Sequence, residues 1–335
     1  MYLMPVVVRR RLGGTRPTDM RAVLAVLVLL LAAGCTSTTD SPTSATPGTT
    51  PDASPAERIA AGDYSGPVDI GGGRQIYLVC RGTGSPTVLL ESGYHDSSDL
   101  WSLADVTPPV PDEAVLPAIA RSQRVCAYDR PGTLRYGEGG GGVTTRTTPV
   151  PMPRTAADVV ADLHALVGAA RVPGPYVLTA HSLGGLFARL YAQTYPGDVQ
   201  GLVLVDTFAP EVPAIFGPLW PAYRDVLSST GTQDDPTAER IDLDVSIAQL
   251  QQAPALPDVP IAVLSKTLPF GGLPPVLPDG FTGAELENRW PQVQAAVVAI
   301  HPQIPQTLVA DSDHYIQVRQ PDLVVSATEL VVGRR

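Results

Sequence analysis

The chain has 335 residues, of which 44 % are hydrophobic, and that share is enough for a sizeable core and too high for a wholly disordered protein. Its 33 acidic and 23 basic side chains give a formal net charge of -10, and a surface of that sign repels phosphate backbones, so we expect no nucleic-acid partner. Three cysteines and five scattered histidines cannot build a Cys/His metal cluster or a disulfide scaffold, and we expect no metal and no cofactor.

The first segment has the pattern of an export signal. Twelve apolar residues at 22–33 follow a basic stretch that ends at Arg21, whereas a membrane-spanning helix needs roughly 20 apolar residues. The sequence Ala-Ala-Gly before Cys35 resembles the lipobox of bacterial lipoproteins, which implies that Cys35 is lipidated after removal of residues 1–34. The alternative is an ordinary signal peptide with an unmodified cysteine. We expect a protein that is exported and anchored by lipid to the outer face of the bacterial cell membrane.

A flexible tether follows the signal. Residues 36–55 are rich in Ser, Thr and Pro and have almost no apolar side chain, so burial cannot offset the entropy cost of ordering them. We expect a tether over residues 35–65 and one folded domain over residues 66–335. Residues 1–34 carry five arginines and one aspartate, so their removal would change the formal charge from -10 to -14.

Beyond residue 66, short β-branched runs alternate with longer helical stretches, which predicts an α/β fold with a mostly parallel sheet covered by helices on both faces. The expected strands are 75–80, 87–91, 124–128, 176–180, 201–205, 260–265 and 306–310. The expected helices are 155–170, 183–195, 284–300 and 321–332.

One junction between strand and helix has the pattern of a nucleophile site. The strand at 176–180 leads through His181-Ser182-Leu183-Gly184-Gly185 into a helix, and the small residues Ala180 and Gly184 lie two positions either side of Ser182. This junction resembles the nucleophile elbow of the α/β-hydrolase family, in which a strained serine stands clear of the sheet and small neighbours let strand and helix approach closely. The resemblance implies that Ser182 is the nucleophile and that the fold is an eight-stranded α/β-hydrolase sheet.

The resemblance also assigns an oxyanion hole. Residues 87–94 match the family's third strand and the glycine turn after it, so the backbone N–H groups of Tyr94 and Leu183 are expected to hold the oxyanion. His95 flanks this turn, where it could touch substrate. Asp129 and Arg130 follow the next strand and are expected to shape their loop rather than to take part in catalysis.

The general base and its acid come later in the chain. His314 lies in the loop after the last expected strand, where the family has its base. Residues 265–268, which follow the strand that often carries the acid, contain no carboxylate, but the preceding strand ends at Asp206, where some branches of the family place it. We therefore expect Asp206 to orient His314, with three alternatives: Asp279, Glu285 and Glu211.

Two further features follow from the same resemblance. Residues 207–258 separate two strands by far more than a usual connection, which implies a small cap inserted after the sixth strand, and residues 270–281 are expected to form a second rim loop. The second and fourth strands are sheet neighbours in this family. Cys80 and Cys126 lie on them, and export into an oxidising space implies a disulfide, with two buried free thiols as the alternative.

The expected function is that of a serine hydrolase which cleaves small-molecule carboxylic esters through an acyl-enzyme, with Ser182, His314 and Asp206 as its triad. Three other hypotheses remain open. A peptidase or acyltransferase would use the same residues, as would a cofactor-free haloperoxidase-like enzyme, and the scaffold could also belong to a catalytically silent, surface-binding lipoprotein. The sequence does not indicate an oligomeric state.

Overall fold

The computed structural model describes residues 53–104, 114–136, 141–228, 235–271, 281–301 and 304–333. The predicted lipidation site at Cys35 and the signal segment before it lie outside the described residues. Within these ranges, no helix combines the length and the apolar character that a membrane span requires.

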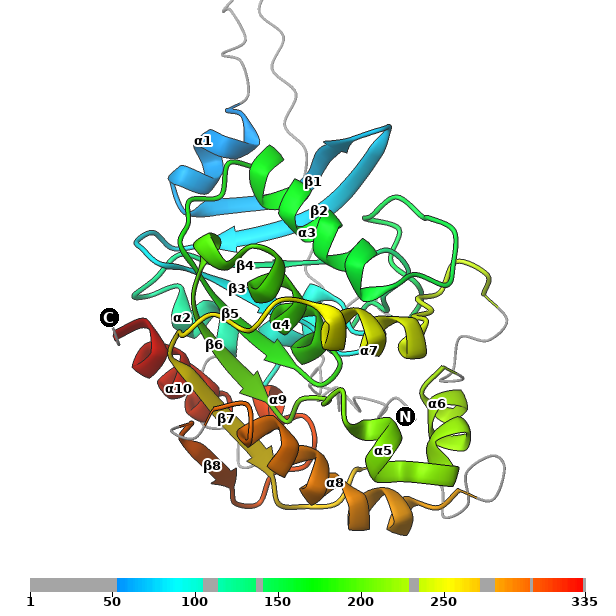
Figure 1. Ribbon diagram of the computed structural model, residues 1–335. Coiled ribbons are helices and arrows are strands. Elements are labelled where there is room, and N and C mark those ends of the chain that lie inside the picture. The colour runs from blue at the N-terminus through cyan, green and yellow to red at the C-terminus, as the bar shows by residue number, and fades with distance from the viewer. Residues whose placement is uncertain are drawn as a thin grey trace, which may run out of the picture. The chain divides into compact units, whose positions relative to one another are not determined.

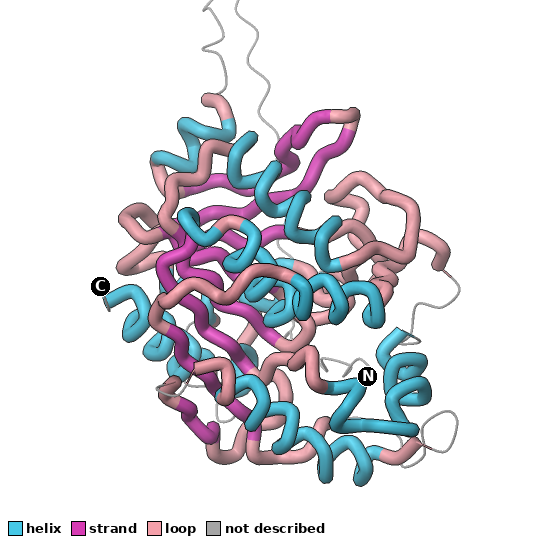
Figure 2. Tube along the Cα trace, viewed as in Figure 1, coloured by secondary structure: helices cyan, strands magenta, loops and turns pink. Residues whose placement is uncertain are grey.

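An eight-stranded sheet forms the centre of the domain, with strand order β1-β2-β4-β3-β5-β6-β7-β8 (Figures 1 and 2). Strand β2 runs antiparallel to both of its neighbours, and all other neighbouring strands are parallel. This topology confirms the predicted mostly parallel α/β sheet. The strands are β1 (Asp63–Gly71), β2 (Arg74–Arg81), β3 (Thr87–Glu91), β4 (Val125–Tyr128), β5 (Tyr176–His181), β6 (Val199–Val205), β7 (Ile261–Lys266) and β8 (Gln306–Val309).

The central strands are buried on both faces, which is why they are continuous apolar runs in the sequence. Successive side chains of a strand point to opposite faces. In β6, Leu202 and Leu204 join the core on one face, and Val203 and Val205 join the core on the other. The first face is covered by α3 (Ala156–Ala169), α4 (Gly184–Thr194) and α8 (Gly283–Val298), and the second by α2 (Val115–Ile119), α9 (Ile316–Arg319) and α10 (Pro321–Gly333).

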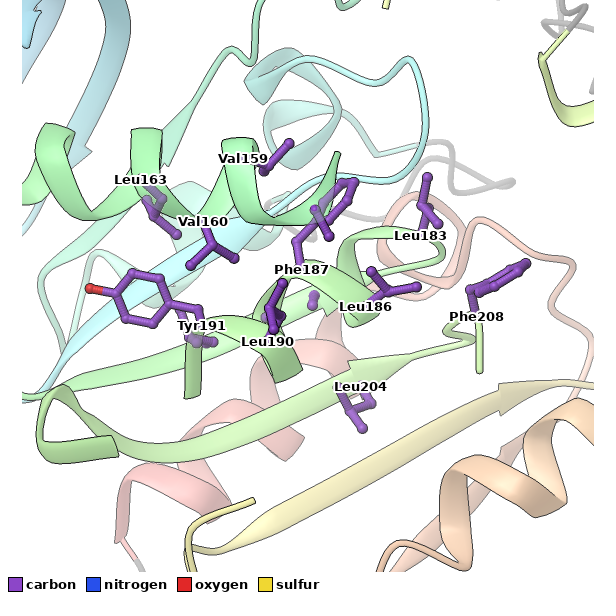
Figure 3. Close-up of a cluster of buried hydrophobic side chains, with 14 of the residues drawn as sticks. Val159, Val160, Leu163, Leu183, Leu186, Phe187, Leu190, Tyr191, Leu204 and Phe208 are labelled. Atoms are coloured by element: carbon purple, nitrogen blue, oxygen red, sulfur yellow. The ribbon is translucent and has the colours of Figure 1, made fainter. Parts of the chain in front are cut away.

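Helix α4 is fixed to the sheet by a layer of large apolar side chains (Figure 3). Phe187 and Leu190 of α4 belong to the same buried cluster as Val160 of α3 and Leu204 of β6. Each fully buried side chain of this size contributes about 1.5–3 kcal/mol to the free energy of unfolding. The N-terminus of α4 is therefore held rigidly at the carboxyl end of β5.

The described fold begins before residue 66. Ser54 and Glu57 form a capping box at the start of α1 (Pro55–Ala60), and the side chain of Ile59 in this helix is buried. Strand β1 starts at Asp63 and was not among the expected strands, because Gly66 and a proline interrupt its β-pattern. Pairing with β2 stabilises β1 as a strand, although the local sequence of β1 does not predict one.

The structure contains the predicted disulfide between Cys80 and Cys126. The two residues lie directly opposite each other on the antiparallel strands β2 and β4. Both side chains are buried. The bond therefore joins the N-terminal hairpin to the parallel part of the sheet.

The described part of the long connection between β6 and β7, residues 206–260, includes the α-helices α5 (Val212–Phe216), α6 (Trp220–Ser228) and α7 (Leu243–Gln252). Phe216 of α5 stacks on Tyr223 of α6, with ring centroids 4.5 Å apart. Helix α7 instead contacts α3 and α4 and extends the helical layer on that face (Figure 1). Among the described residues of the expected cap, Tyr223 and Val226 of α6 line the pocket at the carboxyl ends of the strands.

Candidate active site

Ser182 stands at a strained turn between β5 and α4. Its φ angle is 52°, in the left-handed region that non-glycine residues rarely adopt, and its N–H donates a hydrogen bond to the carbonyl of Val205. Gly184 has no room for a side chain, since a Cβ there would lie 2.5 Å from the Ser92 carbonyl oxygen and 2.6 Å from that of Glu91. The small residue two positions after the serine thus allows α4 to begin directly against the end of β3.

Three predicted site residues meet at this turn. His314 Nε2 lies 2.9 Å from Ser182 Oγ, and His314 Nδ1 lies 2.6 Å from Asp206 Oδ2. Asp206 is fully buried and His314 is 2 % exposed, whereas Ser182 is 9 % exposed and is the most accessible residue of the three. The fold brings together residues that are 132 and 108 positions apart in the sequence.

The carboxylate of Asp206 is held by more than the histidine. Trp290 Nε1–H lies 3.0 Å from each of its oxygens, and the backbone N–H of Lys266 donates to Oδ1. Because an ionised carboxylate only accepts, these donors fix its orientation, and His314 must present Nδ1–H toward it. Trp290 could not be identified from the sequence, since a single tryptophan within a helix carries no signal of this role.

Neither of the two described alternative acids, Glu285 and Glu211, contacts His314. Glu285 accepts hydrogen bonds from Thr282 in the capping box of α8, and Glu211 is an exposed residue at the N-cap of α5. Asp279 lies outside the described residues. Of the four carboxylates considered, Asp206 is the one that the described structure places beside the base.

The two predicted oxyanion amides belong to loops that meet at Ser182. Leu183 is the N-cap residue of α4, and Tyr94 follows the turn at Gly93, where a Cβ would lie only 3.1 Å from Ser182 Cβ. Within the described part of the chain, neither the Tyr94 amide nor the Leu183 amide donates a hydrogen bond to a protein acceptor. Both amides are therefore available to an oxygen bound beside the hydroxyl.

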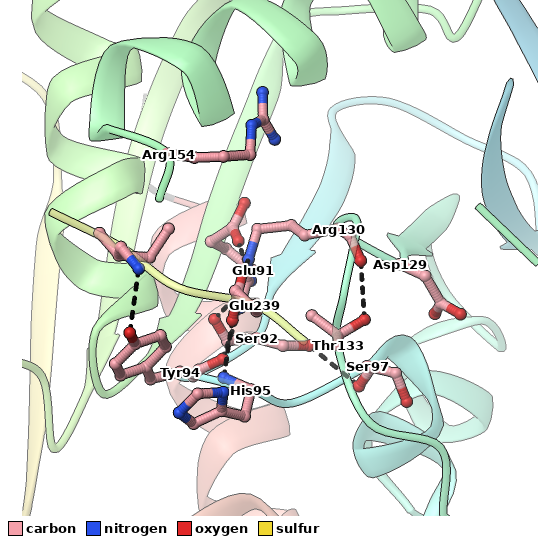
Figure 4. A network of polar contacts seen from close by, with 12 residues as sticks. Glu91, Ser92, Tyr94, His95, Ser97, Asp129, Arg130, Thr133, Arg154 and Glu239 are labelled. Carbon is pink, nitrogen blue, oxygen red and sulfur yellow. Dashed lines mark hydrogen bonds and ion pairs between the residues drawn. The ribbon is translucent and has the colours of Figure 1, made fainter. Parts of the chain in front are cut away.

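Arg130 shapes the loop that carries the Tyr94 amide (Figure 4). Its guanidinium is buried, donates to the carbonyls of Ser92 and Gly93, and pairs with Glu91 at 2.7 Å and with Glu239 at 2.6 Å. Burial alone would lower the pKa of Arg130, but the Glu239 and Glu91 carboxylates outweigh it and raise that pKa. Glu239 comes from the connection between β6 and β7 and was not identified from the sequence.

His95 does not reach the substrate side of the turn. Its ring stacks on Tyr94 with centroids 3.9 Å apart, and its Nε2 lies 3.2 Å from the carbonyl oxygen of Leu227. The Tyr94 hydroxyl accepts a hydrogen bond from the Ile241 N–H, and burial raises the pKa of Tyr94 to about 12. His95 is not among the residues that line the pocket beside Ser182, so its expected contact with substrate is not supported.

A pocket opens beside Ser182 and His314. Its other described lining residues are all uncharged: Tyr94, Leu183, Phe208, Tyr223, Val226, Leu227, Phe270, Leu286 and Trp290. Apolar walls of this kind favour an uncharged, apolar ligand group. Among the described residues, no group of three or more His, Cys, Asp or Glu side chains gathers in a way that could hold a metal ion.

A serine hydroxyl on an imidazole that rests on a buried carboxylate, with two amides beside the hydroxyl, is the arrangement of enzymes that transfer acyl groups through a nucleophile. The sequence profile of the alpha/beta hydrolase fold matches residues 86–328 of this chain. The chain therefore belongs to the alpha/beta hydrolase family, and it is an enzyme of that class.

Solved structures share the fold at low sequence identity. Cfl2 from Burkholderia cenocepacia is 18% identical, and the match covers 80% of this chain and 99% of that one with a TM-score of 0.52. A hydrolase from Pseudomonas aeruginosa is 16% identical, with 81% and 98% covered and a TM-score of 0.51. These similarities establish the fold alone.

Two curated relatives are uncharacterised. YqjL from Bacillus subtilis is 30% identical over 142 residues, which are 39% of this chain and 47% of YqjL. A protein from Schizosaccharomyces pombe is 30% identical over 149 residues, 39% of this chain and 26% of that protein. The chain thus matches less than half the length of either relative, and neither relative assigns a substrate.

Proposed function

We propose that this protein is a serine hydrolase that cleaves carboxylic esters. The observation that carries the proposal is the continuous hydrogen-bonded path from Ser182 Oγ through the His314 ring to Asp206 Oδ2, at 2.9 and 2.6 Å. Since Asp206 requires a proton on His314 Nδ1, the lone pair of the imidazole lies at Nε2, facing the serine hydroxyl. This tautomer is the one that can remove the serine proton.

The reaction follows from this geometry. As Ser182 Oγ bonds to the ester carbonyl carbon, its proton moves to His314 Nε2, and the carbonyl oxygen becomes an oxyanion between the Tyr94 and Leu183 amides. Each such donor lowers the barrier by roughly 3–4 kcal/mol. Collapse of the tetrahedral intermediate breaks the ester C–O bond, and His314 returns the proton to the leaving alcohol. A water molecule, deprotonated in turn by His314, then releases the acid and restores the serine.

The pocket supports an apolar acyl or alcohol group on the substrate. Phe270 lies 4.7 Å from the His314 ring, and Trp290 meets the same ring edge-on, so aromatic groups enclose the base. None of the described lining side chains is charged, and a charged substrate group buried there would lose hydration without a partner.

Labelling with a fluorophosphonate tests the nucleophile. We expect the wild-type protein to be labelled and Ser182→Ala to remain unlabelled, with His164→Gln as a labelled control. Ser182→Ala should also lose turnover of p-nitrophenyl esters, and Asp206→Asn should lower kcat by roughly 10⁴-fold. A wild-type protein that is neither labelled nor active on the ester panel contradicts the proposal. A preference for p-nitroanilides over the matching esters would indicate a peptidase.

We further propose that the enzyme is exported and anchored to the outer face of a bacterial membrane through lipidated Cys35. The support is the sequence pattern of residues 22–35 alone. Labelling of expressing bacteria with a palmitate analogue should mark the full-length wild-type chain and leave Cys35→Ser unmarked. Equal labelling of the two proteins contradicts the anchor.

A further inference from the structure

A second histidine and a second aspartate face each other directly behind the nucleophile. His181 Nδ1 and Asp96 Oδ2 are 3.8 Å apart, and both side chains are fully buried. In the described part of the chain, neither of these two atoms has a hydrogen-bond partner. A buried acceptor without a donor costs roughly 1–3 kcal/mol, so this juxtaposition requires an explanation.

The contacts on the far side of each group determine where a proton must lie. His181 Nε2 lies 2.9 Å from the carbonyl oxygen of His314, which can only accept, so Nε2 carries the hydrogen. Burial and the neighbouring His314 ring lower the pKa of His181 well below its ordinary value, which leaves Nδ1 as a lone pair. A lone pair facing an ionised carboxylate would repel it. The two atoms attract each other only when a proton lies between them.

Asp96 is placed to supply that proton. Its other oxygen, Oδ1, accepts a hydrogen bond of 2.7 Å from the Tyr136 hydroxyl, so Oδ2 is the oxygen left to carry hydrogen. Burial raises the pKa of Asp96 to about 7, well above the ordinary value for an aspartate. Among the described residues, the other charged or titratable groups that act on the two side chains are Arg130, Glu239, His314 and Tyr315.

The pair lies where three loops of the active site meet. The Asp96 N–H donates to the Gly93 carbonyl and closes the turn that carries the Tyr94 amide. His181 directly precedes Ser182 in the chain and holds the loop of the base through the His314 carbonyl. A Cβ at residue 93 would lie 2.8 Å from His181 Nδ1 and 2.9 Å from Asp96 Oδ2, so the turn rests directly on the pair.

We propose that the buried Asp96–His181 pair carries one proton, held on Asp96 Oδ2 and facing His181 Nδ1, and that it acts as a positioning pair that holds the oxyanion turn, the nucleophile turn and the loop of the base in register. Neither side chain lines the substrate pocket, so the pair acts through the residues that it orients. The proposal rests on the proposed hydrolase function. Ionisation of Asp96 would place two facing acceptors under the turn and loosen it, so activity should fall as the pH rises through the pKa of this residue.

Paired substitutions separate donation of a hydrogen bond from mere bulk. Asp96→Asn keeps a donor opposite His181 and cannot ionise, whereas Asp96→Ala removes the donor. His181→Gln keeps an N–H near the Nε2 position, whereas His181→Ala does not. With p-nitrophenyl butyrate at about pH 6, we expect the two alanine variants to lose roughly 100-fold in kcat with little change in KM, because displaced catalytic groups cost about that much. Asp96→Asn should stay within about threefold of wild type, and His181→Gln should recover part of the loss.

The pH profile and an infrared measurement complete the test. The ratio of wild-type kcat to Asp96→Asn kcat should decline between about pH 6 and 8, because every other titrating group is common to the two proteins. A carbonyl stretching band of a protonated carboxyl should titrate in wild type and be missing from Asp96→Asn, whether or not the protein turns over esters. Thermal melts verify folding, and His164→Gln, a half-exposed histidine on α3, is the matched control.

Folded alanine variants with wild-type kcat would overturn the proposal, as would an Asp96→Asn variant that is as impaired as Asp96→Ala. Lack of the infrared band at about pH 5.5 would also overturn it. A wild-type protein without esterase activity or fluorophosphonate labelling would instead contradict the hydrolase function, and the infrared band would still decide whether the pair holds a proton.

Discussion

At the scale of single residues, the acid of the proposed triad depends on a donor that takes no part in proton transfer. Trp290 Nε1–H lies 3.0 Å from both oxygens of Asp206. A hydrogen bond to a charged group contributes about 1.5–3 kcal/mol. Trp290→Phe keeps the ring and removes the donor, so we expect kcat/KM for p-nitrophenyl esters to fall roughly 10- to 100-fold. Steady-state kinetics would measure the loss.

The chain offers a matched control for this substitution. Trp220 Nε1 donates to Asp244 in the connection between β6 and β7, away from His314, and Asp244 is about half exposed. Trp220→Phe should therefore leave kcat/KM within about threefold of wild type, since exposed hydrogen bonds are weak. If both phenylalanine variants retained wild-type kinetics, the carboxylate of Asp206 would not need the indole donor.

Substitution of glycine by alanine should have opposite effects on the free energy of unfolding at two helical positions, Gly184 and Gly168. A Cβ at Gly184 would lie within 2.6 Å of two backbone oxygens of β3 and its loop, whereas a Cβ at Gly168 of α3 meets nothing within 4 Å. We expect Gly184→Ala to destabilise the fold by more than 2 kcal/mol, in the range of overpacked cores. Gly168→Ala should stabilise it by about 0.5–1 kcal/mol. Urea denaturation would measure both, and a well-tolerated Gly184→Ala would contradict the close approach of α4 to β3.

At the scale of elements, the disulfide joins two strands that are 46 residues apart. Closing a loop of this length in the unfolded chain corresponds to about 4 kcal/mol of stabilisation in the chain-entropy description. The double variant Cys80→Ala/Cys126→Ala should therefore lose about 2–4 kcal/mol in its free energy of unfolding. Wild type in reductant should approach the variant, and reductant should not affect the variant. Equal stability of oxidised wild type and the variant would show that packing alone holds β2 against β4.

The central elements could be predicted because their signals are local. The expected strand at 87–91 coincides with β3, and the expected helix at 321–332 differs from α10 by one residue. These segments carry continuous apolar or amphipathic patterns, bounded by proline or glycine. Strand β1 has no such pattern and is ordered by pairing with β2, and the separate packing of α7 on α3 and α4 depends on contacts that no single segment encodes.

The residues of the candidate site also divide into those with a local sequence signal and those without one. The turn around Ser182 is a local pattern, so its small neighbours and its serine were recognisable from spacing. Asp206 was one of several possible acids, because the sequence does not show which carboxylate meets His314. Trp290 and Glu239 were missed, since each acts through a partner more than eighty residues away and has no motif of its own.

At the scale of the whole molecule, Asp96 links stability to pH. Its pKa is about 7 in the folded protein and near 3.8 in an unfolded chain. The stability that its neutral form contributes is therefore complete below about pH 3.8 and is lost as the pH rises to about 7, at a cost of at most about 4 kcal/mol. Asp96→Asn cannot ionise, so it should be more stable than wild type at about pH 8.

Urea denaturation of wild type and Asp96→Asn across this pH range isolates the contribution of Asp96 ionisation to stability, because all other titrating groups are common to the two proteins. Glu91, whose pKa burial also raises, and His181, whose pKa burial lowers, shift both stability curves in the same way. The difference between the curves should reach its plateau above about pH 7 and shrink as the pH falls toward about 4. A difference that does not vary with pH would mean that Asp96 is ionised in the folded protein, and that the buried cluster behind Ser182 carries its negative charge at all pH values where the enzyme works.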